Sequence, residues 1–175
     1  TLWLIAAADF QRLAYCELDP QRNHIEAESD SDGRFRVRFQ RDDQRFLVFG
    51  DMMLVVRGKG FQPKVINLPM ARLQVRVPLE VPLDKAAGAS LRILASNGKP
   101  LRDAKVFPAS ISGKSIPWCV AQNLTAAVSN ADGKVQLSEV DADSLDGVFV
   151  ASDTVGHQRL PVQRLAGGDL TAQAV

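Results

Sequence analysis

The chain has 175 residues, of which 46% are hydrophobic and 23% are charged, and its 21 Lys and Arg residues nearly balance its 20 Asp and Glu residues. This composition is ordinary for a folded globular protein and excludes extended disorder. The near-neutral charge lacks the strong basic excess of a nucleic-acid-binding protein. No apolar run approaches the roughly 20 residues that a membrane-spanning helix needs. We therefore expect neither nucleic-acid binding nor membrane insertion within this segment.

The chain opens with the apolar run Thr1–Ala8, TLWLIAAA, without an initiator Met or the basic region of a signal peptide. The run has the character of a strand, and a start of this kind is typical of a chain trimmed upstream. We therefore expect a segment of a longer protein.

Short strand-like segments rich in Val, Phe and Leu dominate the rest of the chain. They are separated by turn residues, and sustained helical periodicity is absent. Two short helical candidates, at Asp9–Cys16 and Asp141–Leu145, are the exceptions. The pattern predicts an all-β fold of antiparallel strands. The predicted strands are Arg34–Phe39, Arg45–Phe49, Met53–Arg57, Arg72–Val77, Ser90–Ala95, Lys134–Leu137 and Gly147–Ser152.

The sequence also contains an internal similarity between its two halves. Glu26–Phe39 resembles Thr125–Val140, and Leu54–Pro69 resembles Val148–Gln163. The apolar run Thr1–Phe10 likewise corresponds to Ala104–Gly113. The second half carries one further piece, Ser90–Val106, which has no equivalent before Thr1, so the first copy is expected to lack its opening strand. We place the boundary in the Pro-containing stretch Val77–Gly88, giving domains at residues 1–78 and 79–175.

Turn chemistry recurs at equivalent places in the two copies. Asp32-Gly33 in the first copy matches Asp132-Gly133 in the second. Glycine accepts the positive φ of a tight turn, and the aspartate can hydrogen-bond the turn backbone. Near the start of the second copy, Gly98 and Pro100 have a similar role, because proline fixes φ before the next strand.

The order of these motifs resembles the carboxypeptidase-regulatory-like family, which consists of transthyretin-like (prealbumin-like) β-sandwiches. The second copy carries the pattern Gly-Lys-Pro-Leu from Gly98, then Asn-Ala-Asp-Gly from Asn130, and a later glycine at Gly156. The resemblance implies two tandem Ig-like sandwiches that act as accessory domains in exported bacterial proteins, without catalytic residues of their own. Some members of the family bind starch or other glycans, and others serve as stalks or docking modules. The second copy departs from the family pattern by an insertion, Ile111–Leu124, where a private function would be sought.

Metal and catalytic motifs find little support in the sequence. Asp30–Gly33 could suggest a calcium loop, but Arg41 stands where an EF-hand requires glutamate, so a hairpin turn is favoured. His24 and His157 lie in no zinc spacing. Ser152, Asp153 and His157 are close in sequence, yet no G-x-S-x-G elbow accompanies them. We expect no catalytic residue, no metal and no cofactor.

Two cysteines and three aromatic residues remain as candidates. Cys16 and Cys119 precede their Asp-Gly turns at comparable distances, so two buried thiols are favoured over an interdomain disulfide, which stays open. Trp118 either packs in the core or offers a stacking platform to a glycan or protein partner, with Tyr15 and Trp3 as further binding candidates. Packing is the favoured interpretation of Trp118.

These observations predict a non-enzymatic tandem of sandwiches in an extracytoplasmic protein, with a spacer and protein-interaction role. Two alternatives remain open, a carbohydrate-binding module and an accessory domain pair of an upstream hydrolase or sensor peptidase. The partner, protein or glycan, is not specified by the sequence.

Overall fold

The computed structural model describes residues 1–6, 24–36, 52–69 and 78–175, with the backbone alone at residues 2–6, 24–26, 52 and 119. These residues form β-sheets, together with short helical turns. The predicted strands Arg45–Phe49 and Arg72–Val77 and the helical candidate Asp9–Cys16 lie outside the described residues. No helix among the described residues is long and apolar enough to cross a membrane.

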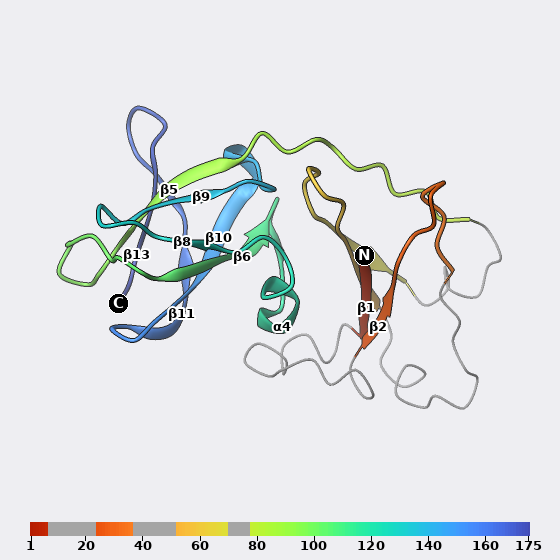
Figure 1. The fold of residues 1–175 in the computed structure, drawn as a ribbon, viewed down its shortest axis with the longest axis horizontal. Coiled ribbons are helices and arrows are strands. Elements are labelled where there is room, and N and C mark those ends of the chain that lie inside the picture. Colours follow the sequence, from red (N-terminus) through yellow and green to blue (C-terminus); the bar gives the residue numbers. More distant parts are fainter. Residues whose placement is uncertain (7–23, 37–51, 70–77) are drawn as a thin grey trace.

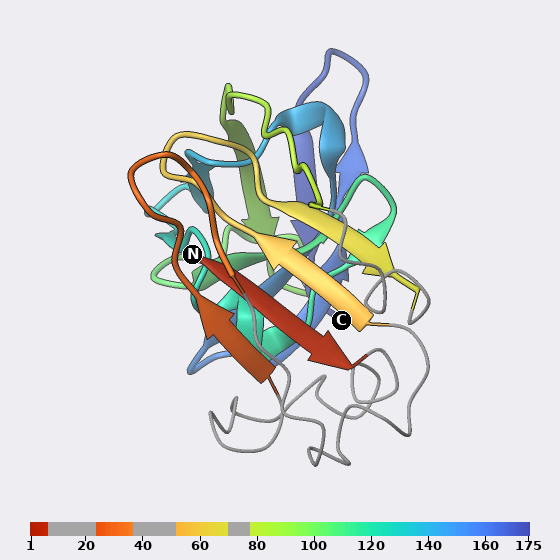
Figure 2. The same ribbon diagram turned by 90° about the vertical axis from the view of Figure 1, so that its right-hand side faces the viewer.

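The N-terminal part contributes a four-stranded antiparallel sheet, which we call the first sheet. Its order is β2-β1-β3-β4, and β3 pairs with β4 so that Val55 lies opposite Val65. Figure 2 shows this sheet facing the viewer, with the rest of the chain behind it. The strands are β1 Leu2–Ala6, β2 His24–Ala27, β3 Met52–Val56 and β4 Lys64–Leu68.

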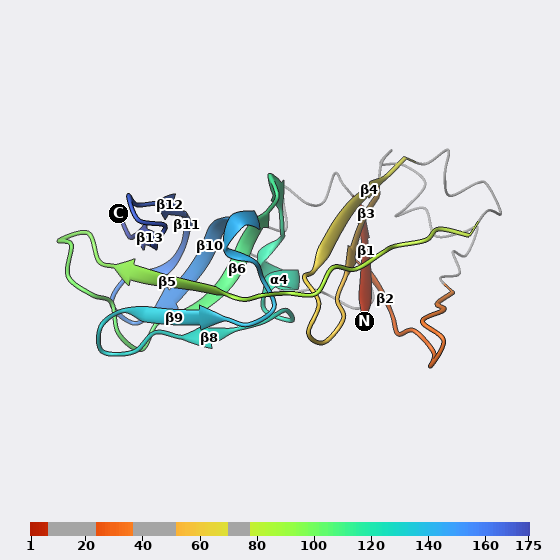
Figure 3. The ribbon, with the colours of Figure 1, turned by 90° about the horizontal axis from the view of Figure 1, so that it is seen from above.

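The C-terminal part forms two further sheets, which together make the two-sheet unit. One sheet has the order β11-β10-β6-β7, with β8 also paired to β6, and the other has the order β12-β13-β5-β9. Figure 3 shows these two sheets facing each other. The strands are β5 Ala89–Leu94, β6 Lys105–Ile111, β7 Lys114–Ser115, β8 Ala127–Val128, β9 Lys134–Leu137, β10 Leu145–Ser152, β11 Gly156–Pro161, β12 Gln163–Arg164 and β13 Leu170–Gln173.

Strand pairing departs from the prediction in one place. The sequence predicted antiparallel strands throughout, but β13 pairs with β5 in parallel, with Leu170 opposite Leu91. A tight hairpin forces neighbouring strands to be antiparallel, whereas strands far apart in the chain can pair in either direction. Turn residues in the sequence mark only the antiparallel pairing of neighbouring strands. The parallel pairing of β13 with β5 therefore could not be predicted from them.

Four of the predicted strands lie where the sequence placed them. The segments Met53–Arg57, Ser90–Ala95, Lys134–Leu137 and Gly147–Ser152 fall on β3, β5, β9 and β10. The expected turn at Asp141–Leu145 is a 3₁₀ turn, η2, at Ala142–Ser144. The prediction of a strand at Arg34–Phe39 is wrong for its described part, because residues 34–36 are irregular. A strand requires a partner, and Lys134 at the corresponding place in the second half pairs with Arg92 of β5.

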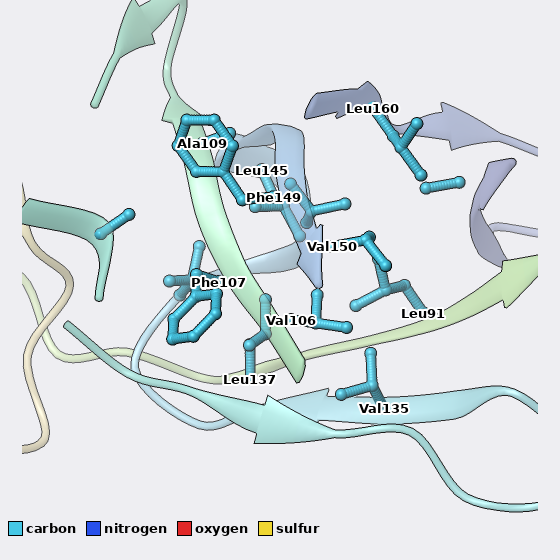
Figure 4. Packing of buried hydrophobic residues seen from close by; sticks show 14 of the residues in the cluster. Leu91, Val106, Phe107, Ala109, Val135, Leu137, Leu145, Phe149, Val150 and Leu160 are labelled. Carbon is cyan, nitrogen blue, oxygen red and sulfur yellow. The ribbon is translucent and has the colours of Figure 1, made fainter. Parts of the chain in front are cut away.

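The hydrophobic core lies between the two sheets of the two-sheet unit. Val106 and Val150 are paired neighbours on β6 and β10, and both are fully buried together with Leu91 of β5 and Val135 of β9 (Figure 4). Val55 and Val65 of the first sheet belong to this same cluster of buried side chains. The core therefore extends from the two-sheet unit to one face of the first sheet.

A single helical turn, α4 (Trp118–Ala121), covers the opposite face of the five-stranded sheet. Its Trp118 ring contacts Phe107 and Phe149, which lie opposite each other on β6 and β10. Seen from above in Figure 3, α4 lies between this sheet and the first sheet. The first sheet, α4 and the two-sheet unit thus follow one another along the longest axis of the molecule (Figure 1).

Candidate functional site

The most distinctive chemistry of the described residues lies at the junction between the first sheet and the two-sheet unit, which we call the joint. The first sheet contributes β3, β4 and their connecting turn. The two-sheet unit contributes the segment of residues 111–125, which contains β7 and α4, and residues 138–144. Figure 1 shows α4 between the five-stranded sheet and the first sheet at this point, and Figure 3 shows the same neighbourhood from above.

A buried carboxylate, that of Glu139, lies at the centre of the joint. Glu139 is 7% exposed and follows β9. Its Oε2 accepts a hydrogen bond from Arg57 Nε at 3.1 Å and one from Thr125 Oγ1 at 2.6 Å. Its Oε1 accepts a third from the backbone N–H of Gly60 at 3.4 Å. The Arg57 guanidinium also donates from Nη1 to the backbone oxygen of Asn123 at 2.9 Å, so one arginine of the first sheet is bound at two points.

These contacts change the proton affinity of Glu139. Burial by itself raises its pKa, because the charged form loses hydration. The hydrogen bonds from Thr125 and Arg57, the charge of Arg57 and the Gly60 N–H act in the opposite direction and outweigh it. The pKa of Glu139 therefore lies below its ordinary value of 4.5, and the carboxylate stays ionised in the folded protein at neutral pH.

The joint also contains buried apolar side chains from both parts. Val55 and Val65 of the first sheet are 0% and 5% exposed, and both belong to the cluster that contains residues of the segment 111–125. Because β-strand side chains alternate, Leu54 and Leu68 point to the other face of the first sheet, and they too are buried. The buried members that the segment contributes are Ile111, Ile116, Trp118, Val120, Ala121 and Leu124.

Polar contacts extend the joint along the β3–β4 turn. The side-chain oxygen of Gln62 accepts hydrogen bonds from Asp141 N at 3.3 Å and Ser144 Oγ at 3.0 Å. Lys114 Nζ donates to the backbone oxygen of Val65 at 2.9 Å. Two hollows flank Gln62, one of about 170 Å³ beside β4 and one of about 450 Å³ over η2. Both are lined by side chains that already bind one another or the backbone, including Gln62, Lys114 and Ser144.

The connection between the two parts is itself fixed to both of them. Gln62 N donates to the oxygen of Asp84 at 2.8 Å, and Ala86 N donates to the oxygen of Gly60 at 3.2 Å. On the other side, Ala87 N donates to Asp141 Oδ1 at 2.5 Å. Residues 78–88 therefore follow the β3–β4 turn and end against η2.

Trp118, the binding candidate with a described side chain, is inside the joint. It is 8% exposed, its ring meets Phe107 and Phe149 edge-on, and His157 covers it at a centroid distance of 4.9 Å. A stacking platform needs a free ring face, and these neighbours leave little of the ring to solvent. Packing accounts for this side chain, and the glycan platform stays a prediction. Tyr15 lies outside the described residues, as do the side chains of Trp3 and Cys119 and the whole of Cys16.

The predicted turn residues lie in turns, with one change of role. Gly33 and Gly133 have φ values of 76° and 70°, as expected for tight turns. The side chain that binds the turn is not that of Asp32 or Asp132 but the one two residues earlier. Asp30 Oδ1 accepts from Asp32 N and Arg34 N at 3.0 and 2.8 Å, and Asn130 Oδ1 accepts from Asp132 N and Lys134 N at 3.0 and 2.9 Å. Gly98, with φ of 76°, and Pro100, bridged to Leu94, form the other predicted turn.

The remaining candidates are placed as follows. Ser152 Oγ accepts from Val155 N at 3.2 Å, while His157 lies on Trp118. In the described ranges no group of three or more His, Cys, Asp or Glu side chains could hold a metal ion.

Sequence reasoning missed Glu139, Arg57 and Gln62. Arg57 and Glu139 are 82 residues apart, and neither belongs to a motif, so no local signal joined them. The one available signal was the insertion Ile111–Leu124, which the structure places in the joint.

Comparison with known proteins does not assign this chain to a family. No family model, curated protein or solved structure matches it significantly.

Proposed function

We propose that the chain is a non-catalytic accessory module of a larger exported protein, in which it acts as a spacer and protein-interaction element. The observation that carries this proposal is the joint. Its buried charge and its conspicuous polar side chains bind one another across two parts of the fold, and its tryptophan packs within the two-sheet unit, as expected of groups that hold a scaffold together. An extracytoplasmic location follows from the resemblance to the carboxypeptidase-regulatory-like family and is part of the same proposal.

We further propose that the two parts are tandem copies of one prealbumin-like unit. The first sheet has the order β2-β1-β3-β4, and the five-stranded sheet contains the order β8-β6-β10-β11. The aligned segments occupy equivalent strands in these two orders. The turns of Asp30–Gly33 and Asn130–Gly133 also have the same set of hydrogen bonds. Both matches support the repeat, and the strand order does so independently of the shared turn residues.

The spacer role is testable by replacement. In the full-length exported protein, residues 1–175 would be exchanged for an unrelated rigid module of equal length. We expect the parent protein to keep its localisation and its activity if spacing is the function. Loss of activity with correct folding would instead assign a specific partner to this chain.

The absence of catalysis is tested separately with the isolated chain. It would be assayed against chromogenic esters, peptides and glycosides, with His157→Ala as the matched variant. No turnover is expected from either protein. Turnover in the wild type that disappears in His157→Ala would contradict the non-catalytic proposal.

A further inference from the structure

The segment of residues 111–125 touches both parts of the molecule at once. On one side, Trp118 packs on Phe107 and Phe149 of the five-stranded sheet. On the other, Lys114 Nζ and the Asn123 oxygen bind the first sheet at Val65 and Arg57. This segment also supplies Thr125, whose hydroxyl donates to Glu139 beside Arg57.

We propose that the segment 111–125 is a docking element that holds the first sheet at one fixed angle to the two-sheet unit, with the Arg57–Glu139 pair as its latch. This inference rests on the proposed spacer role and adds that the spacer is rigid rather than a flexible tether. When the latch is broken, residues 78–88 become the hinge between the two parts.

The latch joins the two parts through a single carboxylate. Glu139 binds three donors, and two of them, Arg57 and Gly60, belong to the first sheet and its turn. A cation at position 139 would face the Arg57 guanidinium at short range in a poorly hydrated site, and like charges in such a site repel strongly. The same substitution would also leave Thr125 without its present acceptor.

The hinge is placed by the contacts of the connecting residues. Gln62, Asp84 and Ala86 bind within the first part of the molecule, whereas Ala87 binds Asp141 of the second. Opening the joint would break the hydrogen bond from Asp141 N to Gln62. It would also release the Arg57 guanidinium from Glu139 and from the Asn123 oxygen.

The test is a distance measurement between spin labels on the two parts. Labels would be attached at Arg34→Cys and Lys134→Cys, two exposed positions that follow the matching turns, in a chain carrying Cys16→Ala and Cys119→Ala. We expect one narrow distance distribution for this background. A broad distribution would overturn the proposal.

Variants of the latch then test whether the Arg57–Glu139 pair keeps the distance distribution narrow. Glu139→Lys should broaden the distribution, and the reversed pair Arg57→Glu with Glu139→Arg should narrow it again, at least in part. The matched control is Arg102→Glu, which breaks an ion pair with Asp103 whose side chains are 76% and 78% exposed and which lies outside the joint. It should leave the distribution unchanged. A Glu139→Lys distribution as narrow as the background would show that the latch does not hold the joint.

Trypsin cleavage after Arg57 gives a second readout on the unlabelled chain, in case the labelled variants fold poorly, because Glu139 and the Asn123 oxygen hold the Arg57 side chain in the closed joint. We expect cleavage to be at least tenfold faster in Glu139→Lys than in the wild type or in Arg102→Glu, with far-UV circular dichroism unchanged. Equal rates in all three proteins would overturn the proposal. A narrow distance distribution, combined with loss of the parent protein's activity when residues 1–175 are replaced by an unrelated rigid module, would instead reject the spacer function. The rigid joint would still stand.

Discussion

Gly33 and Gly133 close two turns with the same hydrogen bonds, but their surroundings differ. A Cβ atom added to Gly33 would meet nothing within 4 Å. One added to Gly133 would clash with the backbone oxygen of Ile93 and approach Leu101 N to 3.2 Å. Both residues have positive φ, so alanine is strained at either position, and Gly133 carries a steric requirement in addition.

This difference predicts unequal effects of the same substitution. Gly33→Ala should lower the free energy of unfolding by about 1 kcal/mol, the cost of a left-handed conformation for a residue with a side chain. Gly133→Ala should lower it by roughly 2–4 kcal/mol, because the backbone of β5 must also move. Urea unfolding of both variants measures the two costs, and equal losses would contradict the close approach of Gly133 to β5.

At the level of elements, α4 depends on contacts beyond its own sequence. It is a single turn, Trp118–Ala121, with no side-chain cap, and short isolated helices are unstable in water. Trp118 fixes the position of α4 on the sheet by packing between Phe107, Phe149 and His157. The helix is therefore stabilised by the five-stranded sheet that it covers.

Removal of this anchor should be costly. Trp118→Ala should lower the free energy of unfolding by about 3–5 kcal/mol, as is usual for a buried aromatic side chain. His157→Ala, which removes the exposed neighbour on the same ring, should cost no more than about 1 kcal/mol. Urea unfolding monitored by circular dichroism compares the two. A Trp118→Ala variant as stable as His157→Ala would show that the ring does not anchor α4.

At the level of the whole molecule, the joint packs the two parts against each other. Val55 and Val65 share a core with the two-sheet unit, and Glu139 joins the parts by an ion pair that is mostly buried. Truncating one partner of such a pair leaves the other without compensation. Since the Arg57 side chain is 34% exposed, solvent reduces this penalty below that of a fully buried pair.

The lowered pKa of Glu139 gives the joint a definite pH dependence. Because folding depresses this pKa, the stabilisation is fully present above the ordinary value of 4.5 and is lost as the pH falls through the lower folded value. Glu139→Gln should therefore cost roughly 1–3 kcal/mol at about pH 7 and progressively less below about pH 4.5. Urea unfolding of both proteins between about pH 7 and about pH 3 measures the difference. A difference that stays constant or grows on acidification would contradict the role of the ionised carboxylate.

Local sequence patterns were sufficient for the parts of the fold that depend on neighbours in the chain. Alternating apolar residues placed β5 and β9, which have one buried face, and short continuous apolar runs placed β3 and β10, which are buried on both faces. The glycines after Asp32 and Asp132 marked tight turns, because positive φ is a property of the residue itself. The parallel pairing of β13 with β5 and the packing of α4 left no such local mark.

Tertiary structure alone decided the candidate site. Arg57, Thr125 and Glu139 are ordinary polar residues in the sequence, and they acquire their special environment only because β3 is brought against the segment 111–125. The same is true of Gly133, since its turn was visible in the sequence but its contact with Ile93 was not. The sequence by itself determined where the chain turns and which faces of its strands are apolar. Contacts between residues up to 82 positions apart determined which apolar faces pack together. The same contacts determined where the buried Glu139 carboxylate lies.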